Sequence, residues 1–322
     1  MTTTVAEISN TEDVPRPEAH KTGGVGSMSL IGLLLTQLLG AMNDNMFRWF
    51  AVCLAMPALG KDEALSIGLA AFTLPYLLLA VPAGFLADRF SKRSVIVGCK
   101  VAEIVIMAIG LAAVMTGNPW LLVAVVALMG SQSALFGPSK FGAIPEIVRH
   151  EALSSANGFM GLVTVGASAI GMVAGYWLHD YSGLTLAAPE FSRLLVPALL
   201  LIGVAAIGTL TSLWIQKLPA ANPEKKIDRS PIAATIRDLK LLGSERAVFR
   251  TALGIAFFWM LASLAQITLD PYGREVLGME EKTLGSLGAI LVLGVGIGSV
   301  LAGLLSAGKV ELGLVPVGAT GI

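Results

Sequence analysis

Several polar and ionisable side chains lie inside the first long apolar segment of the chain, residues 28–58. Gln37, Asp44 and Arg48 recur at helical spacing, so they project from one face of a helix. An ionised carboxylate costs at least about 2.5 kcal/mol in the middle of a membrane span, so such a group faces a cavity or a partner. These positions, with the two flanking asparagines, are the predicted substrate-binding residues: Gln37, Asn43, Asp44, Asn45 and Arg48.

A second interpretation of the same face needs no substrate. Arg48 follows Asp44 by four residues, a spacing at which two side chains on a helix can form an ion pair. In that case the pair would serve only to fix the packing of the helix. The sequence leaves both interpretations open.

Residues 84–93 read G-F-L-A-D-R-F-S-K-R and follow the second apolar segment. A glycine lets two helices approach, and an aspartate can anchor a cation or a helix N-terminus. A plain basic turn at the inner membrane interface would account for the arginines but not for Asp88. The predicted gating residues are therefore Gly84, Asp88, Arg89 and Arg93.

Other polar residues inside apolar segments are weaker candidates. Lys100 and Glu103 form a possible i,i+3 pair near the inner interface, where we expect Lys100 to snorkel towards water. Gln132 and Asn157 are expected at helix interfaces, as hydrogen-bonding contacts between helices or as ligands.

The sequence offers no set of residues for a metal, a cofactor or an enzyme. The three histidines, His20, His150 and His179, are scattered, and the two cysteines lie in apolar stretches. None of the histidines has the downstream aspartate that an acyltransferase of the His-Asp type needs, and no Gly-rich phosphate loop is present. We expect no cofactor and no catalysis.

Composition indicates the elements that must position these residues. Of 322 residues, 55% are hydrophobic and 14% charged, against about a quarter charged in soluble domains. The formal net charge of +0 gives no argument for nucleic acid. Segments long enough to cross the bilayer predict an all-α membrane protein. A ninth span begins near Leu312, after eight complete spans at residues 28–58, 66–87, 94–116, 120–137, 155–178, 194–215, 250–269 and 284–305.

The longest polar stretch divides the spans into two groups. We expect a disordered cytoplasmic tail at 1–27, a six-helix bundle at 28–215, a cytoplasmic linker at 216–249, and a partial second bundle at 250–322. Within the linker, Ser230 can cap an amphipathic helix that begins at Pro231, lying on the membrane surface or packing on the bundle.

Basic residues are distributed asymmetrically between the two sides of these spans. One side carries the cluster at 89–93 and the many lysines and arginines of the linker. The positive-inside rule therefore places the N-terminus in the cytoplasm. The opposite loops hold few basic residues: Lys61, Arg193, Arg274 and Lys282.

Two short stretches suggest an internal repeat. Residues 81–87 read V-P-A-G-F-L-A, and residues 300–306 read V-L-A-G-L-L-S, each in the second span of its group. Such a repeat is typical of transporters built from two six-helix bundles.

The loop at 84–93 resembles the signature of the major facilitator superfamily. Residues 36–48, T-Q-L-L-G-A-M-N-D-N-M-F-R, are similar to the first span of its lysophospholipid transporter family. Residues 132–146, Q-S-A-L-F-G-P-S-K-F-G-A-I-P-E, are similar to that family's loop after span four, and the likeness continues through 153–158 and 294–316. We expect the second bundle to be incomplete, because the chain stops before the family's last four spans.

The resemblance implies the major facilitator fold and a function. Members move lysophospholipid across the bacterial inner membrane for reacylation, and some are fused to acyltransferase domains. For such a substrate, the opposite charges of Asp44 and Arg48 suggest a role for each: Asp44 would take the ammonium of an ethanolamine headgroup and Arg48 its phosphate. Two alternatives stay open: a facilitator for another solute, such as proton-coupled drug efflux, or a non-transporting fragment of a transporter–acyltransferase fusion.

Overall fold

The computed structural model describes residues 23–226, 230–279, 281–306, 311 and 313–320. These residues are almost entirely helical, which confirms the all-α prediction for the part described. The predicted tail up to residue 22 and the expected start of a ninth span at Leu312 lie outside the described residues. The elements are α1 (Met28–Leu59), α2 (Lys61–Leu78), α3 (Ala80–Arg89), α4 (Lys92–Met115), α5 (Pro119–Ile147), η1 (His150–Ala152), α6 (Leu153–Ser182), α7 (Phe191–Ser212), α8 (Pro231–Ser244), α9 (Arg246–Pro271), η2 (Tyr272–Val276), α10 (Glu281–Leu305) and α11 (Leu314–Thr320).

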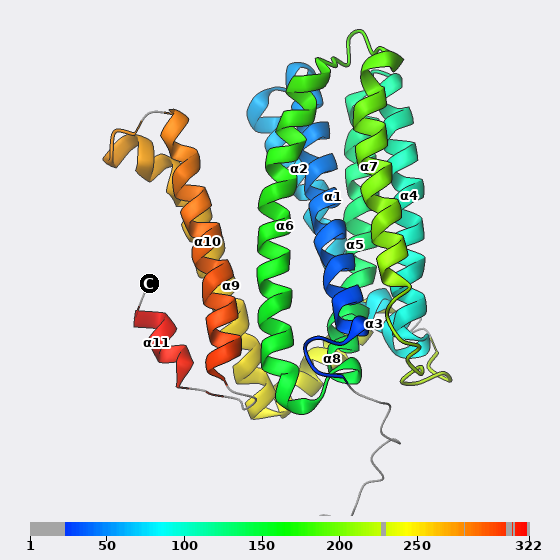
Figure 1. The fold of residues 1–322 in the computed structure, drawn as a ribbon, viewed down its shortest axis with the longest axis vertical. Coiled ribbons are helices and arrows are strands. Elements are labelled where there is room, and N and C mark those ends of the chain that lie inside the picture. The colour runs from blue at the N-terminus through cyan, green and yellow to red at the C-terminus, as the bar shows by residue number, and fades with distance from the viewer. Residues whose placement is uncertain (1–22, 227–229, 280, 307–310, 312, 321–322) are drawn as a thin grey trace, which may run out of the picture.

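Helices α1, α2 and α4 to α7 run side by side as one bundle (Figure 1). Helix α10 packs on α6 at the side of this bundle, with α9 next to it. Among the described residues, five helices are long and apolar enough to cross a membrane, or six if the bent pair α2 and α3 is counted as one span. Helix α1 is not among the five, because its middle carries the polar residues noted above.

The second span is broken rather than continuous. The sequence predicts one helix at 66–87, whereas α2 begins at Lys61 and meets α3 at an angle of 53°. Pro82 lies in the first turn of α3 and has no N–H to donate to the carbonyl of Leu78. The ladder therefore lacks the bond to the Leu78 carbonyl, although Leu79 still donates to Pro75 and accepts from Ala83, and this missing bond explains the bend.

The fourth span is longer than the sequence predicts. The sequence predicts a span that ends at residue 137, whereas α5 continues through Pro138 and Pro145 to Ile147. The buried side chains of Ala143, Ile144 and Ile147 pack with residues of α1 and α4 at the end of the bundle where α1 begins. This burial stabilises the helix beyond the prolines, where local propensity alone would end it.

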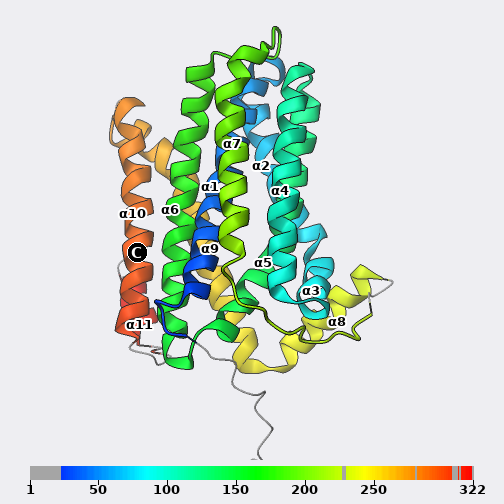
Figure 2. The same cartoon turned by 45° about the vertical axis from the view of Figure 1, so that its right-hand side comes forward.

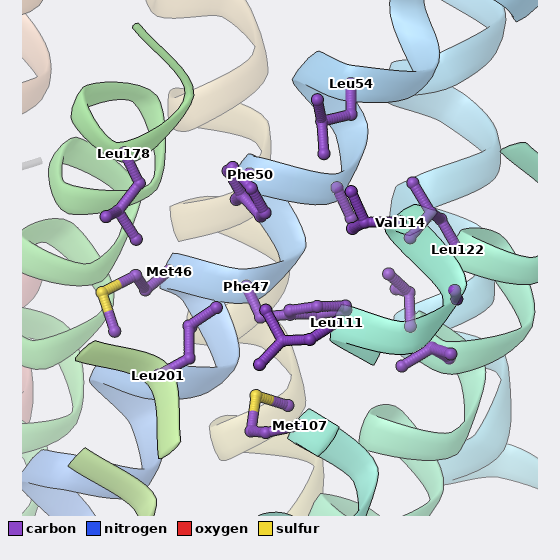
Figure 3. Close-up of a cluster of buried hydrophobic side chains, with 14 of the residues drawn as sticks. Met46, Phe47, Phe50, Leu54, Met107, Leu111, Val114, Leu122, Leu178 and Leu201 are labelled. Carbon is purple, nitrogen blue, oxygen red and sulfur yellow. The ribbon is translucent and has the colours of Figure 1, made fainter. Parts of the chain in front are cut away.

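The main hydrophobic core lies towards the other end of the bundle (Figure 3). Phe47, Phe50 and Leu54 of α1 point into it, and all three are almost completely buried. They meet side chains from α4, α5, α6 and α7: Met107, Leu111, Val114, Leu122, Leu178 and Leu201. Helix α1 is thus held on several sides, and its middle turn, which carries Asp44, is fixed in place.

Glycines bring α6 directly against α1. A Cβ atom added at Gly171 would lie 2.2 Å from the carbonyl oxygen of Met42, and one at Gly175 would lie 2.5 Å from that of Met46. These contacts are with backbone atoms, so neither glycine can be replaced without moving a helix. Small residues at such positions are the usual means of close helix packing in membranes.

We expect Gly171→Ala to destabilise the bundle. Forcing a methyl group into this contact costs about 1–3 kcal/mol, which exceeds the roughly 1 kcal/mol that alanine gains over glycine in a helix. Gly166→Ala is the matched control on the same helix, since an added Cβ there meets nothing within 4 Å. In thermal unfolding in detergent, Gly171→Ala should melt lower and Gly166→Ala should not; equal melting temperatures would contradict the packing described.

The segment after α7 runs across the end of the bundle where α1 begins, and α8 lies beside α3 (Figure 2). As predicted, α8 begins at Pro231, and the Ser230 hydroxyl accepts a hydrogen bond from the Ala233 N–H at 3.4 Å. The side chains of Ile236 and Leu239 are exposed rather than packed on the bundle. This exposure favours the membrane-surface interpretation of the helix over the packed one.

Candidate functional site

A cavity of about 510 Å³ opens between the helices around the middle of α1. Helices α1 to α6 all contribute side chains to it. Four of the lining residues are charged, and the others are polar, aromatic or small. The whole lining consists of Gln37, Gly40, Ala41, Asp44, Asn45, Phe72, Tyr76, Ala80, Ala83, Lys100, Glu103, Gln132, Ser133, Ala134, Phe136, Gly137, Pro138, Lys140, Phe141, Thr164 and Ser168.

Asp44 faces this cavity from α1, as the sequence predicts. Its side chain is buried, and the hydroxyl of Ser133 on α5 donates a hydrogen bond to Oδ2. The other oxygen, Oδ1, is buried and has no hydrogen-bond partner in the described structure. A buried carboxylate oxygen without a partner is costly, so Asp44 is ready to accept a donor that enters the cavity.

Lys140 faces the same cavity from α5. Its Nζ donates to Gln37 Oε1 at 3.0 Å, and Gln37 Nε2 donates in turn to Thr164 Oγ1 at 3.0 Å. The ammonium also lies 4.7 Å from the ring centre of Phe141. The ring centre of Phe136 lies 5.3 Å from the same ammonium. Among the described residues no carboxylate lies within salt-bridge distance of Lys140, so its charge is held by an amide and two rings.

Lys140 is a site residue that the sequence did not predict. The predicted span ends at residue 137, so Lys140 counted only as a basic residue of the loop that follows. The extension of α5 carries it into the bundle instead. The signal that could have found it is the recurrence of apolar residues at helical spacing beyond residue 137, as at Phe136, Ala143 and Ile147.

Lys100 and Glu103 form a buried ion pair on α4, each side chain being 1% exposed. The prediction that Lys100 snorkels to water is therefore wrong. Asn43 of α1 donates from Nδ2 to Glu103 Oε1 at 2.9 Å, which explains why Asn43 itself faces α4. Both members of the pair line the cavity.

Arg48 departs from its predicted role. It is not one of the residues lining the cavity, and it forms no salt bridge with Asp44. Its Nη2 donates to Asn45 Oδ1 at 2.8 Å, and its guanidinium lies 5.4 Å from the ring centre of Trp49 and 5.2 Å from that of Phe72. The rings and the amide draw the side chain away from Asp44, so the ion-pair interpretation is wrong.

The remaining polar candidates separate into two kinds. Gln132 lines the cavity and donates from Nε2 to the Cys99 carbonyl at 3.0 Å, joining α5 to α4. Asn45 also lines the cavity and bonds back to the Ala41 carbonyl. Asn157 is exposed and bonds the Leu153 carbonyl of its own helix, so it does not join two helices.

The predicted gating residues cluster at the end of the bundle where α1 begins, against the segment that follows α7. Lys225 Nζ lies 2.6 Å from Asp88 Oδ2, and Arg89 donates to the carbonyl of Lys225. Arg93 Nη2 donates to the carbonyl of Leu213 at 2.9 Å. Gly84 has open space beside it, so it makes no close helix contact here. Asp88 therefore anchors a lysine of the linker.

We expect Lys225→Gln to loosen the attachment of the linker. The pair is partly exposed and worth about 0.2–1 kcal/mol, which corresponds to at most roughly five-fold faster local opening. Hydrogen exchange at the Asn222 amide, which donates to the Asp88 carbonyl at 2.8 Å, should rise accordingly. Lys226→Gln is the control on the exposed neighbouring lysine, and an equal rise in that variant would contradict a specific contact.

Comparison with known proteins shows the family to which this chain belongs. A family model described as the Major Facilitator Superfamily matches residues 22–321, nearly the whole chain. The chain belongs to the major facilitator superfamily. Its multi-pass helical bundle and its signature loop at 84–93 both agree with that membership.

Several relatives of this facilitator carry the same name. This chain is 28% identical over 279 residues to the lysophospholipid transporter LplT of Serratia proteamaculans (strain 568), and the match covers 85% of this chain and 65% of the relative. The LplT of Yersinia pestis (strain Pestoides F) is 28% identical over 278 residues, with 85% and 64% covered. The predicted resemblance to this family is confirmed, and the chain spans less than two thirds of these relatives' length.

Proposed function

We propose that this facilitator moves lysophospholipid across the bacterial inner membrane, with the cavity around Asp44 and Lys140 receiving the headgroup. One observation carries the proposal. A carboxylate and an ammonium face one cavity, and neither is neutralised by an ion pair among the described residues. That arrangement is complementary to a zwitterion such as a phosphoethanolamine headgroup, which brings one charge of each sign.

The cavity suits this headgroup in its contacts. The unpartnered Oδ1 of Asp44 can accept from the substrate ammonium, and the ammonium of Lys140 can donate to the phosphate. A volume of about 510 Å³ is within the usual range for a small-molecule site. The acyl chain would follow the apolar part of the lining, where Phe72, Tyr76 and Phe141 lie.

Movement of the lipid requires the cavity to change the side to which it opens. In our proposal the predicted division of the chain supplies the moving parts, a bundle at 28–215, a linker at 216–249 and further spans from 250. The loop at 84–93 biases the equilibrium between the two states through its contact with the linker. The delivered lysolipid would be reacylated by an acyltransferase, as a separate partner or a fused domain.

The orientation in this proposal places the N-terminus in the cytoplasm. Single cysteines at positions 92 and 226 should then react only with reagent on the cytoplasmic side, and one at position 185 only from outside. Reaction of position 92 from outside would reverse the topology. The native Cys53 and Cys99 must be replaced first, so that the reporter is the single thiol.

Leaflet-resolved uptake tests the proposal directly. Labelled lysophosphatidylethanolamine should cross the membrane faster in vesicles that contain the protein than in vesicles without it, while the diacyl lipid crosses at the same slow rate in both. Asp62→Asn, at an exposed aspartate of α2, should transport as the unmodified protein does. Equal lysolipid movement with and without protein would reject the proposal, and proton-driven efflux of an unrelated cation would favour the drug-carrier alternative.

A further inference from the structure

Arg48 is a cation within the bundle that the site described so far does not use. Its side chain is partly buried, and no carboxylate of the described residues lies within salt-bridge distance of it. The acceptor that the described residues offer is Asn45 Oδ1, which takes one hydrogen bond from Nη2 at 2.8 Å. A guanidinium has five N–H groups. Donors therefore remain for an anion that comes close to Arg48.

Arg48 adjoins the cavity, although it is not part of the lining. Phe72, whose ring centre lies 5.2 Å from the guanidinium, is a lining residue. Arg48 follows Asp44 by four residues on α1, which is roughly 6 Å along the helix axis. Lys140 lies in the opposite direction, because its partner Gln37 precedes Asp44 by seven residues, or roughly 10 Å. Asp44 therefore has a cation on either side of it.

Two aromatic rings lie against the guanidinium of Arg48, those of Trp49 at 5.4 Å and Phe72 at 5.2 Å between centres. Such contacts stabilise the charge without taking up the N–H groups, which can still bind a phosphate in bidentate fashion. The indole Nε1 of Trp49 is itself buried and has no hydrogen-bond partner in the described structure. The surroundings of Arg48 are thus rich in donors and short of acceptors, which favours an anion.

We propose that Arg48 is a second, weaker phosphate subsite, on the side of Asp44 opposite to Lys140. The inference rests on the proposed function, because it concerns the same headgroup. With its ammonium on Asp44, a phosphoethanolamine headgroup can turn its phosphate towards either cation. Lys140 is the stronger partner in this structure, since it lies in the lining and Arg48 lies beyond it. In the proposed orientation Arg48 is nearer the outer leaflet, so an entering phosphate meets it first and then passes to Lys140.

The test is a double-mutant cycle on the binding of lysophosphatidylethanolamine to the purified chain in nanodiscs of phosphatidylcholine. In the unmodified chain, Arg48→Gln should weaken binding by about two-fold at most, because the phosphate lies on Lys140. In Lys140→Gln the phosphate turns to Arg48. Adding Arg48→Gln to that variant should therefore weaken binding by roughly ten-fold more, as expected for the loss of a charge-assisted contact.

A purely structural role of Arg48 predicts a different pattern. Arg48→Gln would then weaken binding by the same factor in both backgrounds, and an equal or smaller factor in Lys140→Gln overturns the proposal. Arg193→Gln is the matched control at an exposed arginine of α7, for which no effect is expected in either background. If the unmodified chain does not bind lysophosphatidylethanolamine, the proposed function itself fails, a result distinct from binding with equal factors.

A second measurement decides the matter if the double variant does not fold. Lysophosphatidylethanolamine with a photoreactive headgroup, bound to Lys140→Gln, should label residues around Arg48, such as Phe72, more strongly than in the unmodified chain. Lys140→Met, which keeps an unbranched side chain without the charge, takes the place of Lys140→Gln if that variant fails to fold. Labelling that stays between Phe136 and Phe141, or that is lost altogether, overturns the proposal.

Discussion

Asp44→Asn lowers the affinity of the chain for lysophosphatidylethanolamine by roughly ten-fold or more, because a charge-assisted contact to the substrate ammonium is worth about 1.5–3 kcal/mol. Asparagine keeps the size of the side chain and can still accept from Ser133, so the packing of α1 is preserved. Lysophosphatidylglycerol brings no ammonium to this position, and its affinity should not fall. Equilibrium binding in nanodiscs measures both values.

The alternative for Asp44 is a purely structural carboxylate. In that case both lysolipids lose affinity together, and the melting temperature falls with them. Asp62→Asn removes a carboxylate of the same type at an exposed site and should leave both affinities unchanged. A parallel loss for the two lipids in Asp44→Asn would contradict a role in headgroup recognition.

Lys140→Gln has the second large effect, and it falls on both lipids. Every lysophospholipid carries the phosphate that we assign to Lys140, so both affinities should drop by roughly ten-fold or more. Glutamine cannot supply the charge, although it can still hydrogen bond to Gln37. Lys217→Gln is the control at an exposed lysine, for which no change is expected.

The same experiment with Arg48 compares the phosphate contact assigned from the structure with the one assigned from the sequence. The sequence assigns the phosphate to Arg48, whereas the structure places Lys140 in the cavity and Arg48 outside its lining. Arg48→Gln should therefore weaken binding much less than Lys140→Gln. The reverse order would show that the sequence-based assignment was correct.

The residues that sequence could place are those whose position follows from one helix alone. Asp44 and Gln37 share a face of α1 at any register, and a buried carboxylate in an apolar segment indicates a cavity. The loop at 84–93 is set by a local pattern in the same way. In both cases the pattern lies within a short window of sequence, so no information on contacts between helices was needed.

The residues that sequence could not place depend on contacts between helices. Lys140 reaches the cavity only because buried side chains at the C-terminal end of α5 keep it helical past two prolines. Arg48 turns away from Asp44 because Phe72, on α2, offers a ring. The partner of Asp88, Lys225, is far away in sequence and lies in an irregular segment without periodicity.

The most direct measurement is to find where a bound lysolipid headgroup lies. Lysophosphatidylethanolamine with a photoreactive group on its headgroup can be crosslinked to the chain in nanodiscs, and the labelled residues identified by mass spectrometry. We expect labelling of cavity residues on α1 and α5, around Asp44 and between Phe136 and Phe141, which is lost in Asp44→Asn. Labelling confined to exposed side chains of the outer surface, such as Leu195 and Leu199 of α7, and unchanged in that variant, would contradict a headgroup site in the cavity.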